Sequence, residues 1–420
     1  MLRKFFNPAL GALARLARSL DATMLFQSDL GVEVKYKVEP SFNVAAASGA
    51  GAKRFRLNGG GLSMAMAEIR SNERRADFRS SMPRYGSKNV AGGYSADLSV
   101  GSFDDLIEAV LRGTSQAALS ITFATMTTVT TVADGIIAAA GDWRTQGLRV
   151  GQIFRATGLP DAANNSRNLR IVGLTALKIT TAETLIVNAA ADATGTIDVG
   201  KRIIQGDPIV KRSFTFEEYN SDVDESELFT GGKLASMGVS GGPDAMAIAE
   251  FGIVGADEQA LLAAASPYFT APTVPTGIGL TLADAVIRFG GADILTLSSA
   301  AFALDNQQGG QAVIGGRVTP EIFEGPAQLT GSITAIREDL GYVRKYLAET
   351  DLELLMLLTE PGAEPKPYLS FFLGRIKLGK PDKSLGGGNA LMETVPFIGG
   401  NKDATTGYDD TMIQSQTSAT

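Results

Sequence analysis

Alternating apolar and polar residues dominate this chain and predict a β-rich protein. Residues 32–38 read Val-Glu-Val-Lys-Tyr-Lys-Val, which has the period of two expected for a strand with one buried face. Residues 103–111 follow a helical period instead. Their apolar positions are Phe103, Leu106, Ile107, Val110 and Leu111. Ser102 is placed to cap this helix, Asp105 lies at the capping-box spacing, and Gly113 is placed to end the helix.

The same order of elements occurs twice along the chain. In the later copy, residues 288–400, a strand ends near Asn306, a Gly-rich run and a second strand follow, and a helix opens near Asp339. In the earlier copy a strand ends near Asn72, an irregular run and a strand follow, and the helix opens near Asp104. The two separations are 33 and 32 residues. Self-similarity of this kind indicates one folding unit used twice.

Each copy contributes one helix with an apolar side. In the later copy that side consists of Leu340, Val343, Tyr346 and Leu347. One such helix per copy suits a β-sandwich whose outer face the helix covers. The expected fold is therefore mainly β (α+β), with two tandem β-sandwich or barrel domains, each flanked by one α-helix, and a small inserted β-barrel.

The insertion interrupts the earlier copy. Two strands that match the later copy are predicted at 118–125 and 212–219, and about 85 residues between them have no counterpart. This stretch has its own strand and turn pattern around Trp143 and Phe154, which predicts a small closed β-domain. The predicted divisions are an N-terminal arm (1–28), a discontinuous first domain (29–126 and 207–265), the insertion (127–206), a second domain (266–405) and a C-terminal tail (406–420).

Composition leaves few kinds of active site available. The chain has no cysteine and no histidine, which removes thiolate nucleophiles, the usual zinc ligands and the commonest general base. Residues 238–242 have the spacing of a serine nucleophile elbow, but a histidine-dependent triad is impossible, so a hairpin turn is expected there. Glu217 and Glu218 are expected to lie exposed, without a buried partner. We expect no enzyme, cofactor or metal.

Two charged segments of opposite sign are candidate contact sites. The first is a basic run predicted to form an exposed hairpin arm, with Arg70, Arg74, Arg75, Arg79, Arg84 and Lys88. The second is an acidic turn with Asp222, Asp224, Glu225 and Glu227. The basic run alone is equally well explained as a solvated loop, and the acidic turn alone is better explained as a charged surface than as an acid/base site. Together they suggest ion pairs between subunits or successive rings that set register more than affinity.

Membrane and nucleic-acid roles are disfavoured. Residues 1–24 have an apolar helical side, but Arg15 and Arg18 interrupt it, so a docking arm or an unstructured extension is expected instead of an anchor or signal peptide. No other span reaches the roughly 20 apolar residues that a membrane helix needs. The net charge of −7 argues against a tight grip on phosphates, while still allowing nucleic acid to pass.

Several short motifs, in the same order in both copies, carry a resemblance to a known family. They are Ile69–Arg74 leading to Gly93–Leu98, Ser102–Gly113, Arg212–Glu217 followed by Leu228–Gly231, and Asp305-Asn306 leading through Leu329–Ala335 to Glu338–Leu340. On these residues, the chain resembles the tail tube (major tail) proteins of long-tailed bacteriophages over about Gly31 to Asp403. The resemblance is greatest to a double-length type with two tail-tube folds in one polypeptide. Residues 1–24 depart from the pattern.

The resemblance implies a structural virion protein of a siphovirus, assembled in the host cytoplasm. Three chains would form a pseudo-hexameric ring around an inner β-barrel, and stacked rings would form the tail tube through which the genome is ejected. The implied partners are further copies of the chain, the tape measure protein, and the tail terminator and distal tail proteins. Double-stranded DNA would pass through only transiently and without sequence preference.

Two alternatives stay open. A β-rich surface or adhesion protein, or another virion decoration protein, would also show tandem β-domains, but a surface protein needs an export signal that residues 1–24 do not supply. An enzyme with a carboxylate-only site, such as a glycosidase, is expected to have an aromatic-rich cleft. This chain has one tryptophan and 7% aromatic residues.

Overall fold

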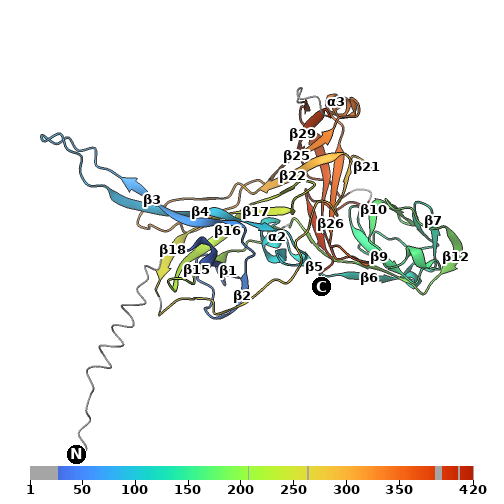
Figure 1. Ribbon diagram of the computed structural model, residues 1–420, viewed down its shortest axis with the longest axis horizontal. Helices are drawn as coiled ribbons and strands as arrows, with labels where there is room; N and C mark the ends of the chain where they lie inside the picture. Colours follow the sequence, from blue (N-terminus) through green and yellow to red (C-terminus); the bar gives the residue numbers. More distant parts are fainter. Residues whose placement is uncertain (1–26, 207, 263, 384–389, 405–406, 420) are drawn as a thin grey trace, which may run out of the picture.

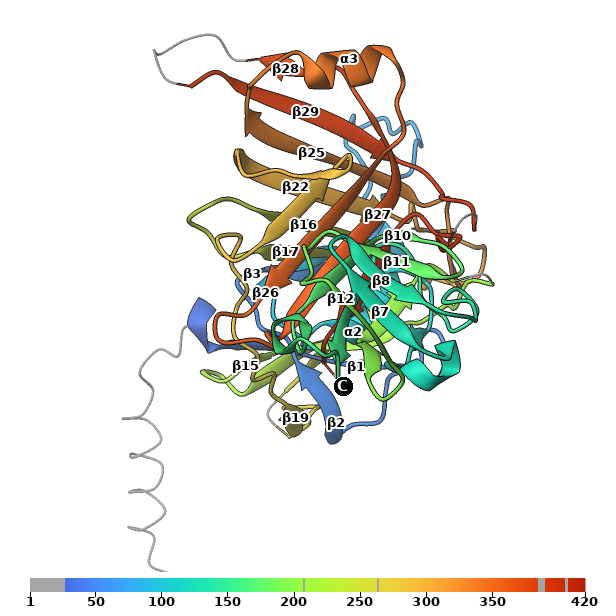
Figure 2. The same ribbon diagram turned by 90° about the vertical axis from the view of Figure 1, so that its right-hand side faces the viewer.

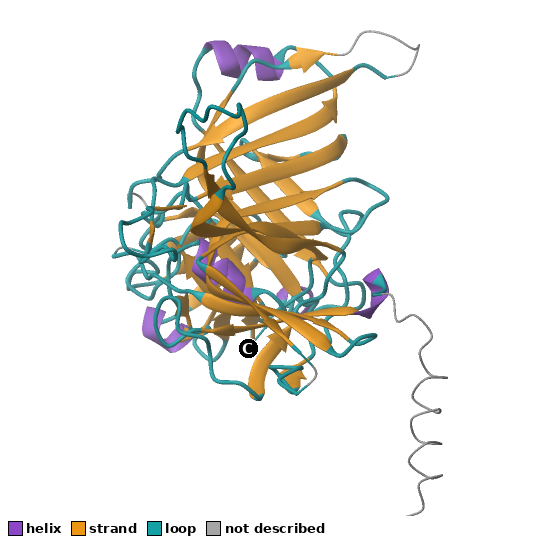
Figure 3. Ribbon diagram, turned by 90° about the vertical axis from the view of Figure 1, so that its left-hand side faces the viewer, coloured by secondary structure: helices purple, strands orange, loops and turns teal. Residues whose placement is uncertain are grey.

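The protein is described here from a computed structural model, in which most of the chain forms strands (Figures 1 and 3). The described residues are 27–206, 208–262, 264–383, 390–404 and 407–419. The expectation for residues 1–24 therefore lies outside the described residues. The β-rich fold class is confirmed, and the two α-helices of the described chain fall one in each copy of the repeat.

The elements form three groups. The first unit holds β1 (Val32–Val38), β2 (Ala50–Arg54), β3 (Gly59–Ile69), β4 (Arg84–Asp97), α2 (Asp104–Val110), β5 (Ser115–Gln116), β14 (Lys201–Ile204), β15 (Phe214–Asn220), β16 (Glu225–Gly241), β17 (Ile248–Gly255) and β18 (Asp257–Leu261). The insertion holds β6 (Leu119–Thr122), β7 (Val129–Val132), β8 (Gly135–Ala138), β9 (Ile153–Thr157), β10 (Leu169–Leu174), β11 (Lys178–Thr181), β12 (Asn188–Asp192) and β13 (Thr196–Val199).

The second unit follows a linker strand, β19 (Ala271–Thr273), that pairs in parallel with β2. It holds β20 (Val286–Phe289), β21 (Ala292–Asp293), β22 (Leu297–Asp305), β23 (Gly309–Gly310), β24 (Ile322–Phe323), β25 (Gln328–Ile336), α3 (Gly341–Leu347), β26 (Leu352–Thr359), β27 (Tyr368–Leu378), β28 (Asp382–Lys383), β29 (Met392–Gly399) and β30 (Gln414–Thr417). Short 3-10 turns lie at Asp29–Gly31, Phe123–Met126 and Ala162–Asn164.

One continuous sheet, called the long sheet here, joins the two units. Its strands pair in the order β3, β4, β17, β16, β22, β25 and β29, all antiparallel. The junction between the units is the pairing of β16 with β22, which runs from Ser236 opposite Asp305 to Gly241 opposite Ala300. On its other side β29 pairs with the end of β27 and, further along, with β28 (Figure 2). The long sheet therefore has β3 at one end and β28 at the other.

The buried side of the long sheet carries the core. Buried side chains recur at alternate positions, as with Glu393, Val395 and Phe397 of β29, whereas in β3 Leu62 is the one buried residue. In the first unit these residues pack with an aromatic cluster in which Phe55 lies 5.4 Å from Phe103 and 6.1 Å from Phe251 between ring centroids. Burying such rings provides the main stabilisation of a sandwich of this kind.

The ends of α2 differ from the sequence expectation. Phe103, not Ser102, is the N-cap residue, and no side chain caps the helix there. The hydroxyl of Ser99 donates to that of Ser102, so Ser102 is held by another partner. The left-handed residue that ends the helix is Arg112, with φ of 52°. The next residue, Gly113, has to be a glycine because a Cβ atom there would lie 1.9 Å from the carbonyl oxygen of Ile204.

The insertion begins earlier than its sequence pattern suggested. The strand expected at 118–125 as part of the repeat is wrong, because β6 pairs with β13 of the insertion sheet. Trp143 and Phe154 are fully buried in the core of the insertion. That core also includes Leu355 and Phe372 of the second unit. The insertion leaves the first unit and packs on the second, and so connects the two (Figure 1).

Charged contacts reinforce this packing of the insertion. The guanidinium of Arg170, 6% exposed, makes ion pairs with Glu183 at 2.5 Å and with Asp293 of the second unit at 2.7 Å. Arg155 donates to the carbonyl oxygen of Lys366 at 2.6 Å. The insertion is thus anchored at several points on a face of the second unit.

Two further sequence expectations are corrected by the pairing of strands. Within the predicted tail, the described residues 407–419 are not separate from the rest of the fold, since β30 pairs with both β14 and β27 and its four side chains are buried. Residues 238–241 lie within β16, and the hairpin turn expected at 238–242 begins only at Gly242, whose carbonyl oxygen accepts from the N–H of Ala245 before β17. Ser240 pairs there with Ile248 on one side and Ala301 on the other.

Candidate assembly surfaces

The arm is a two-stranded projection formed by the outer parts of β3 and β4 (Figure 1). The strands pair as far as Ile69 opposite Arg84, and the residues between them form the exposed tip. Arg70 pairs with Glu68 and Arg75 pairs with Asp77, both within the arm itself. Lys88, at the root of the arm, pairs with Asp257 at 2.5 Å. The other basic residues proposed as contacts, Arg74, Arg79 and Arg84, are also exposed.

The structure separates Asn72 from Asn306, which the repeat pattern had matched. Asn306 is completely buried at the end of β22, whereas Asn72 lies in the exposed tip of the arm. The pairing of strands gives a different correspondence between the two units. The pair Gly61–Gly93 in β3–β4 occupies the place of the pair Ala303–Thr330 in β22–β25. The arm is therefore an extension of the hairpin that the second unit lacks.

The acidic turn joins β15 to β16. Asp222 accepts a hydrogen bond from the backbone N–H of Ser28, and Asp224 accepts one from the hydroxyl of Tyr219. Glu225 and Glu227 are exposed. Among the described residues no ion pair joins the arm to the acidic turn within one chain. The proposed contact between them therefore requires two chains.

A carboxylate cluster lies beside this turn. Glu227 faces Glu218 across the β15–β16 pair, and Glu258 of β18 lies opposite Phe229, two residues further along β16. Burial raises the pKa of all three carboxyls, and each is raised further by a neighbour in the cluster. Glu218 also accepts hydrogen bonds from the hydroxyl of Tyr94 and the N–H of Leu62, and Lys88 partly offsets the effect at Glu258.

This cluster predicts a stability that falls as pH rises. A carboxyl whose pKa is higher in the folded chain holds its proton more tightly there, so its ionisation destabilises the fold above its ordinary pKa of 4.5. The double change Glu227→Gln and Glu258→Gln should raise the thermal midpoint at about pH 8 and leave it unchanged near about pH 4, where the carboxyls are neutral. Thermal unfolding at both pH values is the measurement. An equal effect at both would contradict the assignment.

Glu217 is not exposed, contrary to the sequence expectation. Its carboxylate is fully buried and lies 3.6 Å from the ammonium of Lys35. It accepts hydrogen bonds from the hydroxyl of Ser226 and from the N–H groups of Tyr268 and Phe269. The ion pair between Glu217 and Lys35 is therefore structural, and it connects β1 and β15 to the linker after β18.

The exposed side of the long sheet is small, polar and acidic. Its alternating positions are Ser63, Ala91, Gly93, Ser95, Ser236, Gly238, Ser240, Glu250, Gly252, Ala301, Ala303, Asp305, Thr330, Ser332, Thr334, Thr394, Pro396 and Ile398. The charged residues among these positions are Glu250 and Asp305. Lys377, at the end of β27, lies opposite Ile398 on the same side of the sheet and is exposed, so a cationic side chain accompanies these carboxylates at the far end of the face.

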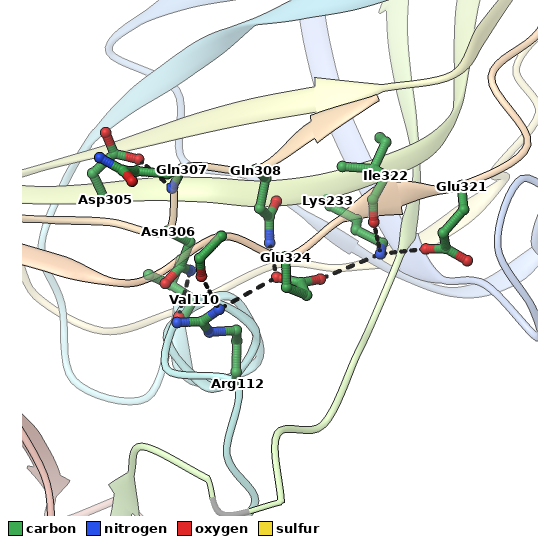
Figure 4. A network of polar contacts seen from close by, with 11 residues as sticks. Val110, Arg112, Lys233, Asp305, Asn306, Gln307, Gln308, Glu321, Ile322 and Glu324 are labelled. Atoms are coloured by element: carbon green, nitrogen blue, oxygen red, sulfur yellow. Dashed lines mark hydrogen bonds and ion pairs between the residues drawn. The ribbon is translucent and has the colours of Figure 1, made fainter. Parts of the chain in front are cut away.

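A buried polar network holds the two units together at the junction (Figure 4). Lys233 of β16 makes ion pairs with Glu321 at 2.6 Å and Glu324 at 3.2 Å. Glu324 also lies 3.7 Å from the guanidinium of Arg112, which follows α2. The side-chain amide of Asn306 donates to the carbonyl oxygen of Val110 at the end of α2. Residues from both units thus fix the position of α2.

Comparison with known protein families decides the identity. A family model described as phage tail tube protein matches residues 30–399. The chain belongs to the phage tail tube protein family. A search of curated proteins found no match. As a tail tube protein, the chain is a structural component of the virion tail that assembles with itself into a tube.

The remaining features agree with a structural role. Among the described residues no group of three or more Asp or Glu side chains could hold a metal ion. No helix in the described part of the chain is long and apolar enough to cross a membrane. The surfaces that stand out are an arm, an acidic turn, two sheet ends and a smooth acidic face, all of which are features of the outside of the subunit.

Proposed function

We propose that three copies of this chain close into a pseudo-hexameric ring, and that stacked rings form the tube through which the phage genome passes into the host. The observation that carries this proposal is the pairing of β16 with β22, which joins the first unit to the second by direct extension of the long sheet. The chain contains one complete example of the junction that the ring would repeat.

The two ends of the long sheet supply the other half of the argument. β3 pairs with β4 alone among the described strands, and β28 pairs with β29 alone. β3 of the first unit corresponds to β22 of the second unit. β16 of the first unit corresponds to β27–β28 of the second unit. Joining β3 of one chain to β28 of the next repeats the internal junction head to tail. Closure of such a sheet removes exposed strand edges, which otherwise invite aggregation.

The number three follows from the resemblance to double-length tail tube proteins. Rings of the family have sixfold geometry, so two tail-tube folds per chain give three chains per ring. The tape measure protein and the tail terminator and distal tail proteins are the further partners that the resemblance implies, with assembly in the host cytoplasm.

The exposed face of the long sheet would line the tube. Its small side chains leave a smooth wall. Glu250 and Asp305 outnumber Lys377 of β27 on this face, so the wall has the same sign of charge as DNA. A repulsive wall lets a phosphate backbone slide without binding, because the counterion release that drives DNA binding needs cationic contacts.

Electron microscopy of the purified full chain over a concentration series tests this function. Rings or tubes with a central hole, and sixfold-like class averages that prove threefold on alignment, are the expected result. Monomers at every concentration, also after addition of a tail initiator complex, would contradict the proposal and favour a surface or decoration protein.

We further propose that the arm meets the acidic turn of a neighbouring chain or ring. The exposed arginines of the arm and the exposed carboxylates of the turn have opposite charge and no mutual ion pairs within one chain. The raised pKa values of Glu227 and Glu258 fit a site that a cation from another subunit would stabilise. Each exposed pair contributes at most about 1 kcal/mol, so the effect is on register.

Reversal of the charge at Arg74 and Arg75 tests this contact. The double change Arg74→Glu and Arg75→Glu should shorten the tubes and make them dissociate at lower salt, since repulsion replaces attraction. The matched control is the double change Arg144→Glu and Lys178→Glu in the insertion, which alters net charge equally. Tubes of normal length and salt tolerance in the arm variant would rule out the contact.

A further inference from the structure

The two helices of the repeat have the same backbone but opposite exposure. Both α2 and α3 are seven residues long, and each is followed two residues later by a non-glycine residue in the left-handed region, Arg112 (φ 52°) and Glu349 (φ 48°). This end geometry makes Leu347 the counterpart of Val110. Five residues of α2 are buried, whereas α3 has no buried residue.

The outer side of α3 is apolar and unpartnered. Leu340 is 55% exposed and Leu347 is 74% exposed. Leu295, which lines a hollow together with Tyr342 of α3, is 95% exposed. The ring of Tyr342 packs on Phe289, 6.0 Å away between centroids, so α3 rests on its own unit by one side only. Large apolar side chains gathered in this way usually mark an interaction site.

The end of α2 shows what covers such a helix. The amide of Asn306 donates to the carbonyl oxygen of Val110 at 2.8 Å. Arg112 donates to the carbonyl oxygen of Gly325 at 2.9 Å and lies 3.7 Å from Glu324. These residues come from the segment that leaves β22 and enters β25. The C-terminal end of a helix in one unit is thus contacted by the hairpin segment of the unit that follows across the sheet junction, while the rest of α2 packs on β14 and β16 of its own unit.

The corresponding segment of the first unit is the root of the arm. It leaves β3 and enters β4, and it exposes the apolar residues Met66 and Tyr85 beside the cations Arg84 and Lys88. This segment belongs to β3–β4, at the end of the long sheet opposite to α3 and β28 (Figure 2). The arm root therefore cannot cover α3 of the same chain, and a second copy has to supply it.

We propose that the exposed side of α3, formed by Leu340, Leu347 and Glu349, docks on the arm root of the next copy of this chain, at Met66, Arg84 and Lys88. The charges reverse the internal example. There Arg112 after α2 meets Glu324. Here Glu349 after α3 is 83% exposed and lies 3.8 Å from Lys377 of its own unit, so it has room for a second cation. In the arm root Lys88 already pairs with Asp257, which leaves Arg84 as the main cation for Glu349. The apolar residues of both surfaces are covered in the same step. This inference rests on the proposed ring.

Cross-linking tests the contact, and the absence of cysteine from the chain makes the test specific. Two single variants, Leu347→Cys and Met66→Cys, are assembled as a mixture and treated with a short bifunctional thiol reagent. A covalent dimer should form in the mixture and not in either variant alone. The double variant should give a ladder that ends at the closed trimer. The control pair is Leu347→Cys with Phe78→Cys, which lies at the tip of the arm and should not cross-link.

Substitution of Leu347 gives an independent readout. Leu347→Asp should raise the protein concentration needed for assembly by at least about tenfold, because one buried leucine is replaced by a charge. The thermal midpoint of the unassembled chain should stay unchanged, since Leu347 is exposed there. Glu349→Lys should weaken assembly as well, and adding Arg84→Glu in the same chain should restore it.

The outcomes separate this inference from the ring itself. Normal tubes from Leu347→Asp, with no cross-link in the mixture, would overturn the α3 contact and leave the ring proposal standing. Monomers without cross-links for the unmodified chain and all variants would overturn both. Tubes that require Leu347, with a cross-linked trimer, support both.

Discussion

Replacing Glu217 by alanine is expected to lower the free energy of unfolding by about 3–5 kcal/mol, because the change leaves the ammonium of Lys35 buried without a counter-charge. Lys35 and Glu217 are 3% and 0% exposed. The change also removes the acceptor for the hydroxyl of Ser226 and for two backbone N–H groups. Each buried donor left without a partner adds a further penalty.

Two control variants make this prediction specific. Lys35→Met should cost less than Glu217→Ala, because the carboxylate keeps its three hydrogen-bond donors when the lysine is removed. Glu68→Ala removes an exposed pair with Arg70 and should change stability by less than about 1 kcal/mol. Urea denaturation followed by circular dichroism measures all three. A loss below about 1 kcal/mol for Glu217→Ala would show that the pair is not structurally important.

Replacing Glu324 by alanine is expected to lower the free energy of unfolding by about 3 kcal/mol and to loosen the junction between the two units. Glu324 is the acidic residue shared by Arg112 and Lys233 (Figure 4). Both cations have side chains under 10% exposed, and Arg112 would be left buried with the carbonyl oxygen of Gly325 as its hydrogen-bond acceptor. Hydrogen exchange should therefore become faster in α2 and at the β16–β22 pair.

Glu321 provides the matched control for this second prediction. It contacts the same lysine at 2.6 Å, but its side chain is 36% exposed. Glu321→Ala should cost less than about 1 kcal/mol, because water solvates the groups that are left. Equal losses of stability for the two glutamate variants would show that burial of the network does not govern its strength. If hydrogen exchange became faster only in the insertion, Glu324 would not stabilise the junction.

The sequence by itself determined the fold class and the family. Period-two patterns such as residues 32–38 match observed strands, since alternation reflects one buried face and is a local property. The missing cysteine and histidine restricted the possible chemistry. The order of short motifs led to the tail tube family, which the family model confirms over residues 30–399.

Only the tertiary structure decided which residues meet. Glu217 looked exposed because nothing in its neighbourhood reveals Lys35, which is brought to it by the pairing of β1 with β15. Asn306 was matched to Asn72 by spacing, but strand register placed one in the core and the other at the tip of the arm. Sequence spacing cannot show register when loops differ in length.

The same limit applies to the helices and the sheet ends. The apolar stripes of α2 and α3 are similar, yet α2 is buried and α3 is not, because burial depends on the distant strands that pack on each helix, which for α2 are β14 and β16. Likewise, the β16–β22 pair joins residues about 60 positions apart, a long-range contact that no local pattern encodes. Local periodicity fixes the elements of this protein, and long-range pairing decides which of their surfaces remain free for assembly.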